Sequence, residues 1–128
     1  MYNNMCEYDI QFEAGTTQFF RFNLFDIYGV PLYLKGEEEK LIKIQKIIFR
    51  MARLGSSESV LDINDDRLIK MPNDIKWDNN IPYIVYELNE QTKNLCGLYE
   101  YQCYLIDEDD KKYSLEDKKI AYITKMIR

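Results

Sequence analysis

The chain has 128 residues, of which 46% are hydrophobic and 14% aromatic, and this composition fits one compact domain over residues 1–128. It has no histidine, which excludes Ser-His-Asp catalysis, Cys-His catalysis and histidine-ligated zinc. Its net charge of −5, with no basic stripe, argues against a nucleic-acid partner. We therefore expect a protein that is not an enzyme and that has no cofactor and no metal site.

The first residues carry neither the positive charge nor the apolar stretch of a signal peptide. No apolar run approaches the roughly 18 residues that a membrane span needs, so we expect a cytoplasmic product without a membrane partner. Cys6, Cys96 and Cys103 are odd in number and lack a CxxC spacing. They are expected to be reduced thiols, and Cys103 to be a small buried hydrophobe, rather than parts of a disulfide framework or a zinc site.

The first elements show a hydrophobic period of two. Residues 8–13 and 20–24 predict two antiparallel strands, joined by a short link that contains Gly15. Residues 26–31 predict a turn, because they include a glycine that can adopt a positive φ and a proline that can fix the exit. Residues 32–34 resume the extended pattern.

Residues 36–55 fit either a helix or a strand. Acidic residues at the start, basic residues near the end and Gly55 after them suit a helix matched to its dipole. Four isoleucines in the same stretch favour a strand, with one slip in the alternation near Lys46 of the kind that a β-bulge produces. We prefer the strand, and the helix remains the alternative.

The rest of the chain predicts short strands separated by turns. Trp77 is expected to anchor a loop by packing beneath it. The expected elements are a loop at 55–59, strands at 60–63 and 68–71 around a turn at 64–66, irregular connections at 72–74 and 77–80, a strand at 84–88, one helical turn at 89–95, a strand at 99–105, an acidic reversal at 107–112 and an interrupted last strand at 113–126. Such an order predicts an all-β antiparallel sandwich.

Two acidic runs, at 64–66 and 107–110, are the candidates for binding a hard cation. Neither run has the spaced ligands and the glycine of an EF-hand loop, so both are interpreted as solvated turns. With 22 acidic residues in the chain, spacing alone singles out no pair of catalytic carboxylates.

Residues 95–101 form the most informative local pattern. In immunoglobulin-like sandwiches, a tyrosine at the start of the penultimate long strand returns its hydroxyl to the backbone just upstream. Gly97 allows the chain to turn tightly into such a strand, and Tyr99 follows it. We therefore interpret Gly97 and Tyr99 as a structural tyrosine corner, with the Tyr99 hydroxyl bonded near residues 94–97.

Several segments together carry a resemblance to a known family. They contain a D-x-x-G-x-P turn, a G-x-Y-x-Y strand start and an ending of threonine followed by a basic residue, and they cover residues 12–17, 22–34, 86–88, 95–102 and 113–125. This order resembles the N-terminal immunoglobulin-like module of phage upper-baseplate and related tail-associated structural proteins. The chain departs from that pattern at 37–40, at 54–82 and at 117–119, where a glycine is often expected.

The resemblance implies an immunoglobulin-like antiparallel β-sandwich of about seven to nine strands. It also implies a phage or prophage virion structural protein, made in the bacterial cytoplasm and incorporated into the virion as a tail or baseplate component, an adaptor or a capsid decoration. We expect no fibre or receptor-binding region after residue 128, and therefore a small building block. Its partners would be other virion proteins or copies of itself.

Outward apolar positions at Phe19, Phe25 and Tyr104 suit such an assembly, although the sequence does not identify the assembly surface. The terminal strands, 8–13 and 120–128, are expected to offer a sheet edge to a partner. The alternative is a soluble carbohydrate- or peptide-binding module that uses its tyrosines and Trp77 as a stacking platform.

Overall fold

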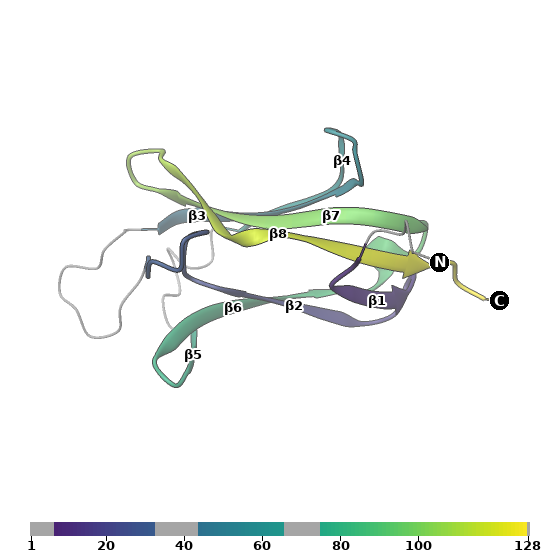
Figure 1. Ribbon diagram of the computed structural model, residues 1–128, viewed down its shortest axis with the longest axis horizontal. Coiled ribbons are helices and arrows are strands. Elements are labelled where there is room, and N and C mark those ends of the chain that lie inside the picture. Colours follow the sequence, from purple (N-terminus) through teal and green to yellow (C-terminus); the bar gives the residue numbers. More distant parts are fainter. Residues whose placement is uncertain (1–6, 33–43, 66–74, 128) are drawn as a thin grey trace, which may run out of the picture.

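The structure, a computed structural model, describes residues 7–32, 44–65 and 75–127, which form eight β-strands in two sheets packed face to face (Figure 1). The five-stranded sheet has the order β1 (Ile10–Glu13), β8 (Lys112–Thr124), β7 (Gly97–Asp107), β3 (Ile44–Arg53) and β4 (Ser59–Asp65). The three-stranded sheet has the order β2 (Gln18–Asn23), β6 (Ile81–Leu88) and β5 (Lys76–Asp78). The all-β sandwich predicted from the sequence is confirmed.

The strand order follows that of immunoglobulin-like sandwiches, in which one sheet is A-B-E-D and the other contains C, F and G. The three-stranded sheet, β2-β6-β5, corresponds to B-E-D, while β3, β7 and β8 correspond to C, F and G. Within the described ranges, no strand lies at the position of strand A beside β2. Among the described residues, the outer side of β2 therefore has no paired strand, and we call this side the open edge of β2.

The predicted pairing of the first two strands is wrong. Instead of forming a hairpin with β2, β1 pairs with β8 in parallel, and β2 pairs with β6 in the opposite sheet. The link between them crosses from sheet to sheet: the Ala14 amide donates to the Thr124 carbonyl at 2.9 Å, and the Gly15 amide to the Thr92 hydroxyl at 2.9 Å. Gly15 has φ +80°, and this turns the chain away from β1 before a hairpin can form.

Residues 44–53 form a strand, as preferred, and not a helix; residues 36–43 lie outside the described ranges. The pairing of β3 with β7 shifts register between Ile44 and Lys46, at the predicted slip. The turn expected at 64–66 is wrong for Asn64 and Asp65, which continue β4 opposite Ile48 and Ile47. Pairing with β3 there overrides the local turn preference of Asn and Asp.

Four further expectations lie wholly or mostly outside the described ranges: the strand at 68–71, the irregular connection at 72–74, the extended residues at 32–34 and the thiol of Cys6. Leu32, which begins that extended stretch, lies in a bend and is buried.

The connection expected at 77–80 is instead the tip of a β-hairpin. Lys76–Asp78 forms β5 and pairs antiparallel with β6. Asn79 (φ 49°) and Asn80 (φ 68°) are both left-handed, which is the backbone of the two-residue turn that favours asparagine. Trp77 is half-buried and packs against the hydrophobic core, as expected for a packing anchor.

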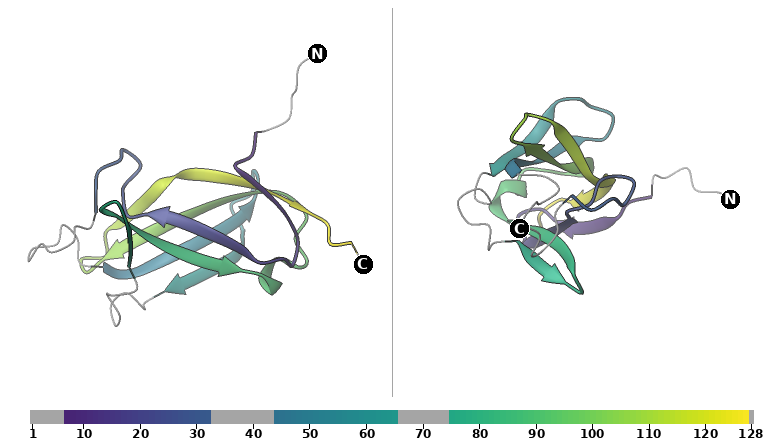
Figure 2. Two further views of the ribbon diagram at one scale, coloured as in Figure 1. Left: turned by 90° about the horizontal axis from the view of Figure 1, so that it is seen from below. Right: turned by 90° about the vertical axis from the view of Figure 1, so that its left-hand side faces the viewer.

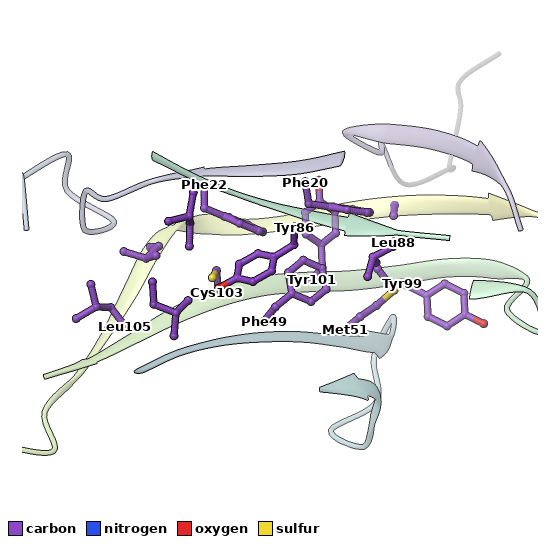
Figure 3. Close-up of a cluster of buried hydrophobic side chains, with 14 of the residues drawn as sticks. Phe20, Phe22, Phe49, Met51, Tyr86, Leu88, Tyr99, Tyr101, Cys103 and Leu105 are labelled. Carbon is purple, nitrogen blue, oxygen red and sulfur yellow. The ribbon is translucent and has the colours of Figure 1, made fainter. Parts of the chain in front are cut away.

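The core between the sheets is dominated by aromatic rings (Figure 3). Tyr101 on β7 meets Phe20 on β2 edge-on, with ring centroids 5.0 Å apart, and stacks on Phe49 of β3 at 6.2 Å. Tyr101 stands two residues after Tyr99, the position at which antibody domains carry a cysteine of the disulfide between their sheets. Here, aromatic packing between β2 and β7 takes the place of that covalent link, while Cys103 is buried nearby and is not in a disulfide.

The last strand is interrupted, as predicted, by a bulge at Glu116. The register between β7 and β8 shifts after Tyr101, and Glu116 has φ 57°. Its amide donates to the Phe25 carbonyl at 3.2 Å, and its carboxylate accepts the Asn23 amide at 3.0 Å. One residue of the five-stranded sheet thus binds the end of β2 in the other sheet.

Candidate assembly surface

The turn at 26–31 is built around one carboxylate. The Asp26 side chain accepts the amides of Tyr28 at 2.8 Å and Val30 at 2.9 Å. The Asp26 amide donates to the Val30 carbonyl at 3.0 Å, and the Gly29 amide to the Asp26 carbonyl at 3.0 Å. Gly29 adopts φ +80°, as the sequence predicted. These bonds hold the turn in one backbone conformation.

This turn carries three exposed apolar side chains and projects from the sandwich (Figure 2). Tyr28 is 84% exposed, Val30 53% and Ile27 44%. We name Ile27, Tyr28 and Val30 the apolar turn. The apolar turn was not predicted from the sequence. Its signal is the apolar residues between the aspartate and the proline of a turn, where polar residues are usual.

The edge strand β2 adds a second exposed apolar group. Phe19 is 65% exposed on the outer face of the three-stranded sheet, as its sequence position predicted. Beside it, the guanidinium of Arg21 lies 3.7 Å from the centre of the Tyr83 ring and pairs with Asp78 at 3.3 Å. Phe25 and Tyr104, the other two outward positions, are half-buried and offer less apolar surface.

Only one of the two terminal strands lies at an edge. The first, β1, is the edge of the five-stranded sheet, whereas β8 lies between β1 and β7. The expectation of an open edge at the last strand is therefore wrong, because parallel pairing with β1 covers it. Tyr8 and Tyr122 contact each other at 5.5 Å on this side and leave a smaller exposed apolar area.

Two hollows lie on the described surface. One of about 140 Å³ lies on the outer face of the five-stranded sheet, where its charged groups pair as Arg50 with Asp62 at 2.9 Å and Lys118 with Glu100 at 3.6 Å. A larger one, of about 900 Å³, lies between residues 93–96 and 125–127.

The acidic run at 107–110 is a turn whose first residue is structural. Asp107 is largely buried, and its carboxylate accepts the amides of Asp109 and Lys111, each at 2.9 Å, and the Tyr113 hydroxyl at 3.3 Å. The expectation of a solvated turn therefore needs correction at Asp107, which the hairpin uses as a cap. In the part of the chain that the structure describes, no three His, Cys, Asp or Glu side chains are placed to share a metal ion.

The tyrosine-corner residues stand at the start of β7. Tyr99 is fully buried, and its hydroxyl accepts the Cys96 amide at 3.0 Å and donates to the Cys96 carbonyl at 3.2 Å. Arg53 donates a third bond to the same hydroxyl at 3.0 Å. Gly97 has φ +113°, a backbone conformation that residues with a Cβ rarely adopt. The hydroxyl thus bonds within the expected range of residues, and its role is to fix the entry into β7.

Across the described ranges, no helix has the length and apolar character that crossing a bilayer requires. Comparison of the chain with protein-family models, curated proteins and solved structures finds no match. The surface itself therefore supplies the argument about function.

Proposed function

We propose that this chain is a non-enzymatic structural protein of a phage or prophage virion, a tail or baseplate component, an adaptor or a capsid decoration. It acts by binding other virion proteins or copies of itself. The observation that carries the proposal is the apolar turn, because it presents three apolar side chains to solvent on a backbone that Asp26 holds in place.

Such a turn has the properties of a binding anchor. Apolar and aromatic side chains that become buried at the centre of an interface supply most of its affinity. A segment that is already ordered loses little conformational entropy on binding, so more of the contact energy remains as affinity. Tyr28, with its large and amphipathic ring, is the strongest single candidate for such an anchor.

The alternative, a carbohydrate- or peptide-binding module, finds less support in the same surface. Trp77 packs against the core, and the Arg21 guanidinium covers the ring of Tyr83. Sugar-binding platforms need an uncovered aromatic face beside hydrogen-bonding groups. Tyr28 has an exposed ring, but the other exposed side chains of its turn, Ile27 and Val30, are apolar and offer no hydrogen bond. A glycan array should therefore show no saturable binding, and saturable binding that Trp77→Ala abolishes would favour the alternative.

The test is incorporation into particles. A strain from which the gene has been deleted is complemented with the wild type, with the double variant Tyr28→Ser and Val30→Ser, or with Val60→Ser as a control on β4, and released particles are separated on a density gradient. Val60 is 45% exposed and lies on β4, outside the apolar turn, so it controls for the loss of an exposed apolar side chain elsewhere on the surface. The wild type and the control should enter the particle fraction, and the double variant should fall by about tenfold or more, the effect of losing ~1.4 kcal/mol of binding.

An equal melting temperature of the three proteins ensures that folding does not explain the difference. Wild-type protein that is absent from particles would contradict the proposal.

A further inference from the structure

We propose that the open edge of β2 pairs antiparallel with β2 of a second copy, so that two three-stranded sheets join into one six-stranded sheet. The inference deepens the proposed assembly function and rests on it for its biological use, since it names one partner as the chain itself.

The pairing with β6 determines which backbone groups of β2 face outward. The Leu24 amide donates to the Pro82 carbonyl at 2.9 Å, so Leu24, Phe22 and Phe20 direct their backbone groups toward β6. The residues between them, Phe19, Arg21 and Asn23, direct theirs away. Among the described residues no strand pairs with this side, so it presents a template for another strand.

Glu116 closes one end of this edge and thereby restricts the register. Its carboxylate takes the outward amide of Asn23, which leaves the outward groups of Phe19 and Arg21 within β2. A two-fold axis at Phe20 places Phe19 opposite Arg21 of the second copy, and Arg21 opposite its Phe19. In this register, every one of these amides and carbonyls finds a partner, which gives four hydrogen bonds across the two-fold axis.

The side chains that would meet on the outer face are complementary. An arginine opposite an aromatic ring can place its guanidinium on the ring face, which is the favourable cation–π arrangement. The two-fold axis makes this contact twice. In the single chain, Arg21 folds back over Tyr83 and toward Asp78, so its charge does not extend across the edge to protect it.

The other described edges are less suited to self-pairing. The strands β1 and β5 have four and three residues. A two-fold axis at the middle of β4 would place Asp62 opposite itself, and like charges that face each other across strands are repulsive. These comparisons favour β2 as the edge that pairs. A second copy of the chain carries both Phe19 and Arg21, so it supplies the residue that each of them would face.

The test uses the whole chain and compares charge variants at one position. Sedimentation velocity at protein concentrations up to about 1 mM should show a dimer. Phe19→Lys places a lysine opposite Arg21 of the second copy and should raise the Kd by about tenfold or more, whereas Phe19→Glu, with an attractive contact there, should bind at least about tenfold more tightly than Phe19→Lys. Val60→Lys makes the same charge change on β4 and should leave the Kd unchanged.

A second measurement locates the contact. In amide hydrogen exchange followed by NMR, the amides of Phe19 and Arg21 should become protected as the protein concentration rises. The amide of Asn23 is already bonded to Glu116 and should not change.

A monomer throughout this concentration range, or a dimer that responds equally to Phe19→Lys and Val60→Lys, would overturn the inference. A monomeric protein that still enters particles would overturn the β2 pairing and leave the proposed function intact. A β2 dimer that never enters particles would support the β2 pairing and overturn the proposed function.

Discussion

The Tyr99 hydroxyl makes three hydrogen bonds in a fully buried position, and two of them are to the backbone of Cys96. The Cys96 amide and carbonyl would lose a partner in a partly buried position, which costs free energy where water replaces that partner incompletely. Tyr99→Phe removes the hydroxyl while it keeps the packed ring. We expect a loss of about 0.5–1.5 kcal/mol in the free energy of unfolding.

Urea denaturation measures this loss, and Tyr28→Phe is the matched control, because it removes a hydroxyl from a side chain that is 84% exposed. The control should change the free energy of unfolding by less than about 0.5 kcal/mol. An unchanged midpoint for Tyr99→Phe would show that the corner does not stabilise the fold.

Tyr101 makes stability sensitive to alkaline pH. Burial raises the pKa of its phenol above the ordinary value of 10.0, and the carboxylates of Asp9 and Glu116 raise it further. The folded state therefore holds this proton more tightly than the unfolded state does, so the phenol contributes stability below pH 10 that declines as the pH rises above it. Denaturation between pH 8 and about 11 should show this decline, with a shallower slope for Tyr101→Phe. Equal slopes would contradict the assignment.

Among the elements, the bulge at Glu116 combines a destabilising backbone conformation with a stabilising hydrogen bond. Its left-handed backbone disfavours any residue with a Cβ, whereas its carboxylate binds the Asn23 amide. Glu116→Ala loses the bond and keeps the strain, while Glu116→Gly loses the bond and relieves the strain. We expect the glycine variant to be more stable than the alanine variant by about 1 kcal/mol.

Thermal denaturation compares these variants, and Glu116→Gln, which retains an acceptor oxygen, should lie near the wild type. A glycine variant no more stable than the alanine variant would mean that the bulge backbone is not strained.

Elements with strong local signals were predictable from sequence, and pairings between distant segments were not. The strand at 44–53, its slip near Lys46 and the interruption of β8 are visible in the alternation of side chains. The partner of β1 is not, because residues 10–13 alternate equally well beside β2 or β8. The short strand β5 was missed, because three residues are too few for a period to show, although Asn79-Asn80 was a hairpin signal.

The same division holds for the candidate site. Sequence reasoning located Tyr99 because its hydrogen bonds are local, and it placed Phe19 outward from the period of β2. It did not find the apolar turn, because turns are expected to be polar and the six residues 26–31 show no hydrophobic alternation. It also could not show that no described strand pairs with the outer side of β2, since an edge is a property of the whole sheet.

For the whole molecule, net charge and exposed apolar area have opposite effects on self-association. A net charge of −5 repels identical copies, so association through apolar turns and strand edges should strengthen as salt screens that repulsion. Sedimentation velocity at low and high salt should show more dimer at high salt. Association that weakens with salt would instead indicate contacts dominated by opposite charges.

The central claim, that this chain is a virion part that works through protein contacts, is tested most directly by cryo-electron microscopy of particles from a strain that carries the gene. We predict density for the two-sheet sandwich at defined positions of the particle, with Ile27, Tyr28 and Val30 buried against a neighbouring protein. Particles that lack this density, with the chain recovered only outside them, would contradict the account.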